Sequence, residues 1–273
     1  MQSNVYSLLI SSKERWEEIE LLLEKATPDN SDCQIEQKFK NSLCRASCVL
    51  MVSHLEGFLK DLSKALIDDL NHNLEYKDIP ESVRRTACSH FLPEGAKSSA
   101  HYVNRLDEEF SNSPSYKLNS DAFQLDNKNP KEDVVRKIMS NFGIQNIFKN
   151  LHKSRFEVVF ESYSKAIRYL DRMEKVALAT TEIFPYNCRT KSFNFKTTNY
   201  SGTTLWETFL QDINFVRHKI VHGSSLDSER SIGSIKDSLT KIRLFQYLVT
   251  YISCSYVTPN RIGQQDNITL LND

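Results

Sequence analysis

The sequence predicts an all-α protein, a helical bundle that carries a helical insertion and a short basic and aromatic hairpin or loop. Only seven of its 273 residues are glycine and seven are proline, so residues that interrupt helices are sparse. Apolar residues recur every three or four positions over long stretches, which is the period of a helix. A hydrophobic content of 40% and a charged content of 26% are ordinary for a globular protein of this length.

The N-terminal part of the chain predicts two helices. The first covers residues 3 to 26 and has an acidic outer face. The second covers residues 34 to 71 and is the expected spine of the bundle. Its apolar residues are spaced by four or eight positions: Ile35, Phe39, Leu43, Leu50, Phe58, Leu62 and Leu66.

The sequence predicts a single domain over residues 1–273 with an insertion at about 77–150. Short helices are expected in the insertion at about 80–91, 96–111 and 130–141, separated by proline-containing or polar runs. A long helix over 154–183 follows, then a basic and aromatic loop at about 185–202. A last apolar helix is expected at 234–256.

Between that loop and the last helix, the chain predicts a helix from about residue 205 to 222. Thr204 and Glu207 have the spacing of a capping box, in which each side chain bonds the backbone of the other residue. Gly223 can adopt the left-handed conformation that commonly follows a helix end. The final turns of this motif helix therefore carry the cationic or ionisable residues Arg217, His218 and His222 beside a flexible exit.

These residues suit phosphodiester chemistry. The planar guanidinium of Arg217 can clamp a phosphoryl oxygen, and the imidazole of His222 can donate or accept a proton near neutral pH. Five positions separate them, so they point about 140° apart around the helix and lie about 7.5 Å apart along it. A more natural site would collect them from two copies of the helix.

The Arg217-x4-His222 spacing, with a polar residue after the arginine and a glycine after the histidine, resembles the signature of the HEPN family. Residues 45–62 also look like the N-terminal helix of a bacterial HEPN-like nuclease group. The resemblance implies an all-α fold, a homodimer, and metal-independent cleavage of RNA by Arg217 and His222 without a cofactor. It also implies a bacterial toxin or phage-defence effector, with an antitoxin or defence-system protein as a candidate partner.

Three further residues are auxiliary candidates for this site. For His218 the two interpretations are a phosphate ligand and a structural residue, and for Glu56 they are an orienting carboxylate and a surface group. His54 shares a helical row with Leu50 and Phe58 and is expected to face inward, where a hydrogen-bonded core histidine is the commoner case.

RNA binding is predicted for Arg189, Lys191, Lys196 and Lys219. The first three lie in a loop with four aromatic residues and no acid, a composition that suits single-stranded nucleic acid. Net charge is zero, yet residues 145–223 hold twelve Lys and Arg against seven Asp and Glu. A loop held to the bundle by its phenylalanines and a solvated basic surface remain the structural alternatives.

Other classes of protein are disfavoured. His218 and His222 have the spacing of a zinc protease, but Lys219 occupies the position of the glutamate base, so no metal site is expected. No phosphate-binding glycine loop occurs. Six cysteines without a Cys-x-x-Cys pair predict buried thiols, including Cys44 and Cys48, and a reducing cytoplasm. Neither a signal peptide nor a membrane span is expected.

Two alternatives to the ribonuclease stay open at this point. One is a catalytically inactive HEPN-like module that binds RNA, nucleotide or a partner protein. The other is a structural helical scaffold in which Arg217 and His222 cap helix ends. The sequence does not separate these functions from catalysis.

Overall fold

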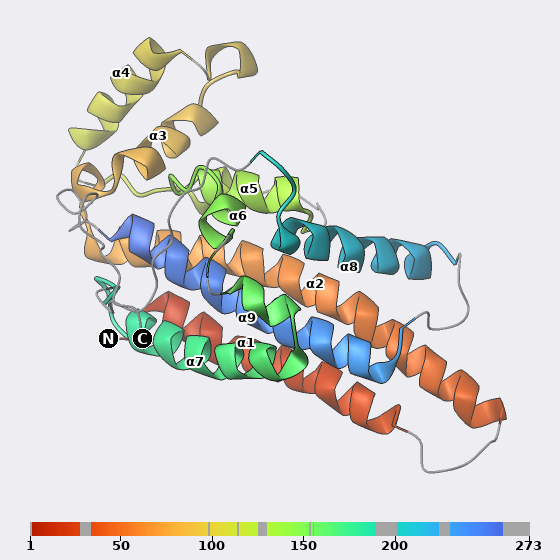
Figure 1. Cartoon of the computed structure of the whole chain (residues 1–273). Coiled ribbons are helices and arrows are strands. Elements are labelled where there is room, and N and C mark those ends of the chain that lie inside the picture. Colours follow the sequence, from red (N-terminus) through yellow and green to blue (C-terminus); the bar gives the residue numbers. More distant parts are fainter. Residues whose placement is uncertain are drawn as a thin grey trace.

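The computed structural model describes residues 2–27, 34–97, 99–113, 115–124, 130–152, 154, 156–188, 201–223 and 230–258. Within these ranges every regular element is a helix, as predicted (Figure 1). The α-helices are α1 (Asn4–Lys25), α2 (Gln34–Asn73), α3 (Glu81–His90), α4 (Ala100–Ser111), α5 (Glu132–Ser140), α6 (Ile147–Leu151), α7 (Tyr163–Thr181), α8 (Leu205–Val221) and α9 (Ile232–Val257). The 3-10 helices are η1 (Tyr76–Asp78), η2 (Glu94–Ala96), η3 (Ser120–Phe123) and η4 (Glu157–Phe160).

Four long helices, α1, α2, α7 and α9, form the bundle. α1 packs along α2, α7 packs along α9, and α9 also lies against α2 (Figure 1). α9 is buried on nearly every face, which is why its sequence is apolar with small polar residues between. The fully buried Gln246 of α9 accepts a hydrogen bond from Trp16 Nε1 at 2.9 Å and donates one to Ser12 Oγ at 2.8 Å. These bonds fix α1 on the central helix.

α8 lies across the outside of this bundle. It contacts α2 and also touches α5, α6 and η4 (Figure 1). Trp206 of α8 is fully buried, and its ring lies 5.6 Å from that of Phe245 and 4.9 Å from that of Phe160. This aromatic cluster anchors the beginning of α8 and leaves its other end at the edge of the molecule.

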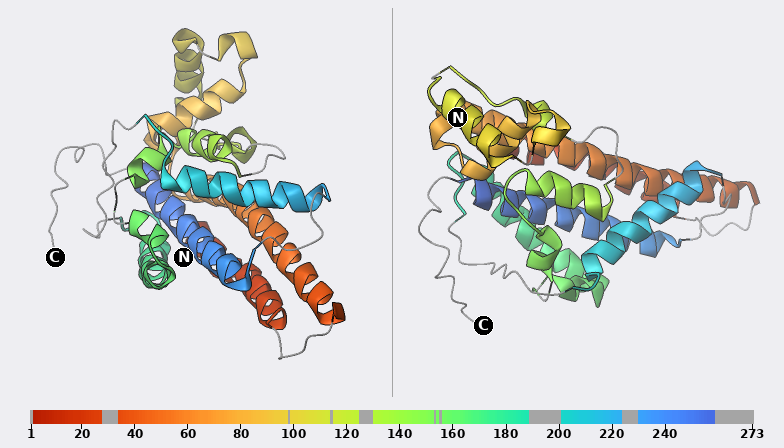
Figure 2. Two further views of the ribbon diagram at one scale, coloured as in Figure 1. Left: turned by 45° about the vertical axis from the view of Figure 1, so that its right-hand side comes forward. Right: turned by 90° about the horizontal axis from the view of Figure 1, so that it is seen from above.

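The predicted insertion divides into two structural parts. α3 and α4 pack on each other and project from the bundle near the end of α2 (Figure 2). α5 and α6 instead share the core of the bundle, because Val135, Phe148 and Leu151 are fully buried in the same apolar cluster. The three helices expected here are confirmed with narrower bounds, and α6 was not predicted.

One predicted helix is wrong. The sequence predicts a continuous helix over residues 154–183, but η4 ends at Phe160 and α7 begins only at Tyr163. Ser162 between them is extended, with φ −160° and ψ 149°, and its hydroxyl accepts a hydrogen bond from Lys165 N. A serine N-cap competes well with helix continuation, which explains the break.

The expected hairpin or loop at 185–202 lies mostly outside the described residues. Its first residues are fixed, since the hydroxyl of the buried Tyr186 donates to Asp69 Oδ2 at 2.7 Å. Asp69 also accepts from the backbone N–H groups of Asn4 and Val5, so it caps α1 as well. Elsewhere Cys44 and Cys48 are buried, as predicted. No helix in the described ranges combines the length and apolarity that crossing a membrane requires.

Candidate functional site

The candidate site lies on α8, and this helix begins with the predicted capping box. Thr204 Oγ1 accepts from Glu207 N at 3.2 Å, and Glu207 Oε2 accepts from Thr204 N at 2.7 Å. Glu207 Oε1 also accepts from Arg136 Nη2 of α5 at 2.6 Å. Burial opposes ionisation of Glu207, but the hydrogen bonds from Thr204 and Arg136 outweigh it and lower the pKa of the carboxyl. The box thus ties α8 to α5.

The end of α8 also follows the prediction. His222 is the C-cap residue, and its N–H donates to His218 O at 3.0 Å. Gly223 has φ +70° and donates to Ile220 O at 3.2 Å. Among the described residues, apart from its chain neighbours, no atom lies within 4 Å of the position that a Cβ would take at Gly223, so the backbone conformation favours glycine there.

The two residues of the motif differ in environment. Arg217 is half-buried, whereas His222 is exposed. The exposed His218 lies beside His222, with ring centroids 4.2 Å apart and an interplanar angle of 51°. Arg217 and His222 therefore occupy different sides of the helix, as their spacing predicts. The residue whose ring lies beside His222 is His218.

An exposed aromatic residue continues the row of histidines along α8. Phe215 is 56% exposed, and Lys219 Nζ lies 4.9 Å from the centroid of its ring. We call Phe215, His218, Lys219 and His222 the histidine face. This face carries one cation, an imidazole pair and a ring that is open to solvent, which are the groups that phosphates and bases contact.

A groove of about 640 Å³ adjoins the histidine face. It runs between α8 and the beginning of α5 and is lined by Lys131, Glu132, Thr208, Gln211, Asp212, Asn214, Phe215 and His218. Gln211 Nε2 donates to Glu132 Oε1 at 2.9 Å across it. Asp212 forms an ion pair with Arg230 near the start of α9. Neither Glu132 nor Asn214 was predicted to belong to a site. The one signal for Asn214 in the sequence is that it is a polar residue within the apolar stripe of α8.

The side chains of His54 and Glu56 contact other groups. His54 is 16% exposed, its Nε2 lies 3.3 Å from Glu18 Oε2, and its ring meets Trp16 edge to face at 5.8 Å. Burial is the main cause that lowers the pKa of His54. Glu56 accepts from Lys60 one turn later at 3.0 Å. The inward placement of His54 is as predicted, and both side chains engage partners on α1 or α2.

The three predicted RNA-binding residues of the loop, Arg189, Lys191 and Lys196, lie outside the described residues. Their role stays a prediction. In the part of the chain that is described, no cluster of three or more His, Cys, Asp or Glu side chains has the arrangement of a metal site.

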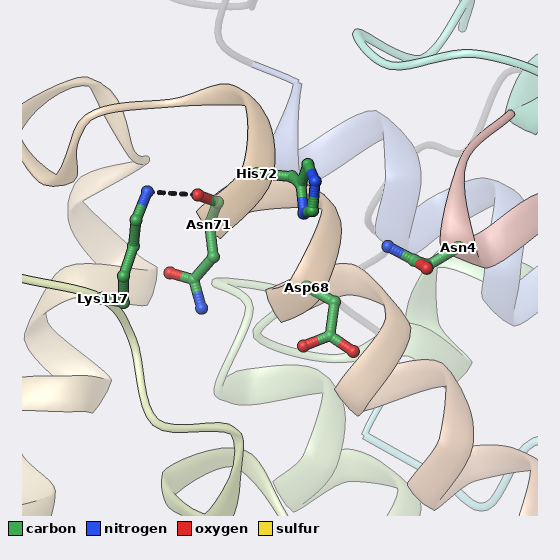
Figure 3. Close-up of a pocket in the computed structure, with 5 residues that line it drawn as sticks. All are labelled: Asn4, Asp68, Asn71, His72 and Lys117. Carbon is green, nitrogen blue, oxygen red and sulfur yellow. Dashed lines mark hydrogen bonds between the residues drawn. The ribbon is translucent and has the colours of Figure 1, made fainter. Parts of the chain in front are cut away.

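A second pocket, of about 410 Å³, lies at the C-terminal end of α2 (Figure 3). It is lined by Asn4, Asp68, Asn71, His72 and Lys117. Lys117 donates to the carbonyl of Asn71, and Asn4 Nδ2 donates to Asp69 Oδ1 at 2.9 Å. This polar pocket holds none of the motif residues, so the histidine face and its groove form the candidate site.

Comparison with known proteins identifies the family. The model of the RiboL-PSP-HEPN family matches residues 10–256, which is well over half of the chain and includes α2, α7, most of α1 and α9, and the motif on α8. Searches of curated proteins and of solved structures gave no match. HEPN domains are often ribonucleases, so a nuclease-type function is compatible with the match. The chain belongs to the RiboL-PSP-HEPN family, within the HEPN superfamily.

Proposed function

We propose that this protein is a metal-independent endoribonuclease whose active site is built from Arg217 and His222. The observation that carries the proposal is the end of α8. There the exposed His222 caps the helix beside His218, and a left-handed Gly223 turns the chain away. A histidine in this position is open to substrate and is held by its own backbone bond to the helix.

In the proposed reaction the 2′-hydroxyl of one nucleotide attacks the adjacent phosphorus. The P–O2′ bond forms as the P–O5′ bond breaks, and the products are a 2′,3′-cyclic phosphate and a 5′-hydroxyl. One imidazole takes the proton from the 2′-hydroxyl as general base, and a protonated imidazole donates a proton to the departing 5′-oxygen as general acid. The guanidinium of Arg217 stabilises the charge on the nonbridging oxygens. His218, beside His222, is placed to orient it or to bind phosphate.

We further propose that the active species is a homodimer in which two α8 helices meet. Arg217 and His222 diverge around one helix, so a second copy would supply the missing partner of each. The exposed Val221, at 54%, offers apolar surface beside the motif for such an interface. The biological setting we propose is bacterial conflict, with the protein acting as a toxin or phage-defence effector that cleaves cellular RNA in the cytoplasm.

The test is incubation of purified protein with RNA in EDTA. Wild type should cleave and leave cyclic phosphate ends, while Arg217→Ala and His222→Ala should each lose at least about 100-fold in rate. Arg105→Ala and His101→Ala are matched controls, because both residues are exposed on the projecting α4. They should cleave like wild type.

Mixing the two inactive variants tests the homodimer. If Arg217 of one copy acts with His222 of the other, heterodimers retain one intact site and the mixture regains activity. Loss of cleavage in EDTA, a 3′-hydroxyl product, or full activity of a monomer would each contradict part of the mechanism. A protein that binds RNA without cutting it would instead support the inactive binding module.

A further inference from the structure

The groove beside α8 is lined by Asn214, whose amide oxygen has no donor among the residues that the structure describes. Asn214 is only 5% exposed, and its Nδ2 donates to Leu210 O at 2.8 Å and to Pro130 O at 3.2 Å. Both acceptors are carbonyls, so reversing the amide would set its oxygen against two other oxygens. Asn214 Oδ1 is therefore fixed as an acceptor, and it receives no hydrogen bond from any described residue.

A second acceptor of the same kind lines the groove. Glu132 Oε1 is occupied by Gln211, but the buried Oε2 accepts no hydrogen bond within the described part of the chain. Glu132 follows Pro130 by two residues, and Asn214 bonds Pro130, so the two acceptors belong to the same edge of the groove. Buried acceptors without donors are destabilising, and a ligand that supplies two donors would relieve both.

The surroundings of these acceptors fit a base attached to a phosphate chain. Phe215, also in the groove lining, presents an exposed ring on which a base can stack. His218 lines the groove and also contacts His222, so the groove leads directly to the motif. Lys131 at the rim and Lys219 above Phe215 supply positive charge for phosphates.

We propose that this groove binds a guanine base of the RNA and thereby selects where the strand is cut, a proposal that rests on the ribonuclease function above. The Watson–Crick edge of guanine carries two adjacent donors, N1–H and the 2-amino group. One would bond Glu132 Oε2 and the other Asn214 Oδ1. Adenine, cytosine and uracil each set at least one acceptor against these oxygens. Asn214 Oδ1 and Glu132 Oε2 are both buried, so side chains at the rim of the groove must shift before a base can reach these oxygens.

The test measures binding separately from cleavage. Full-length protein is titrated against fluorescent oligodeoxyuridines that contain one central guanine, hypoxanthine or adenine, and binding is followed by anisotropy. These probes lack the 2′-hydroxyl, so they report on the groove whether or not the protein is a ribonuclease. We expect guanine to bind about tenfold more tightly than adenine, with hypoxanthine between them because it lacks the 2-amino group.

Glu132→Gln should remove most of this preference, because one oxygen is replaced by a donor group. Asp133→Asn is the matched control: it removes a charge from the same turn of α5, but Asp133 is exposed and does not line the groove. Its preference should match that of wild type. Equal affinity of wild type for the three probes, absence of binding, or an unchanged preference in Glu132→Gln would each overturn the proposal. None of these outcomes would decide whether Arg217 and His222 cleave RNA, because the cleavage assay in EDTA tests that separately.

Discussion

Replacing Glu207 with alanine should destabilise the protein by about 2–3 kcal/mol, although the residue takes no part in the proposed chemistry. Glu207 is 6% exposed and accepts hydrogen bonds from the N–H of Thr204 and from Arg136. Thr204 is 2% exposed, so its N–H would be left buried without an acceptor. That loss costs about 1–3 kcal/mol. The side chain of Arg136 is 37% exposed and its charge can be rehydrated, so its share is smaller, at most about 1 kcal/mol.

Urea unfolding followed by circular dichroism measures this change. Glu94→Ala is the control, because Glu94 also pairs with a basic side chain but is 90% exposed, and its loss should leave the free energy of unfolding close to that of wild type. Thr204→Ala should lower the free energy of unfolding by an intermediate amount, about 1 kcal/mol, because it removes only the cap. If Glu207→Ala is no more destabilising than Glu94→Ala, the capping box does not hold α8 in place.

The pH dependence gives a second check on Glu207. Its pKa is lowered in the folded protein, so its contribution to stability is present above the unfolded value of 4.5 and is lost as the pH falls through the folded value. The difference in stability between wild type and Glu207→Gln should therefore shrink below pH 4.5. A difference that stays constant down to acid pH would contradict the assigned hydrogen bonds.

Two further predictions concern backbone conformation and a buried imidazole. Gly223→Ala should lower the free energy of unfolding by about 1 kcal/mol, because the residue is left-handed. Gly143→Ala should lower it by more, because its Cβ would also lie 2.6 Å from Ser82 Oγ. Thermal unfolding of both variants measures which is less stable. Since burial lowers the pKa of His54, stability should be full above pH 6.5 and decline below it, and His54→Gln should flatten that decline in urea titrations.

Local sequence patterns determined much of the protein. The capping box of Thr204 and Glu207 and the left-handed Gly223 fix both ends of α8, and the structure has them as predicted. These features involve neighbouring residues, so spacing alone specifies them. The apolar period likewise predicted the long helices α1, α2 and α9 within a few residues. The prediction failed at Ser162. The apolar period continues across this residue, but its side chain caps the start of α7, so the helix begins only at Tyr163.

Only the tertiary structure decided which distant residues meet at the candidate site. Glu132 and Gln211 are far apart in sequence, and nothing in their local patterns indicates that α5 lies beside α8. The same holds for His54, whose row on α2 predicted burial but not that Glu18 and Trp16 of α1 would be its neighbours. Helical periodicity states which face of a helix is buried, whereas the partner of that face depends on how all the helices pack together. The motif on α8 could therefore be read from the chain, and the groove beside it could not.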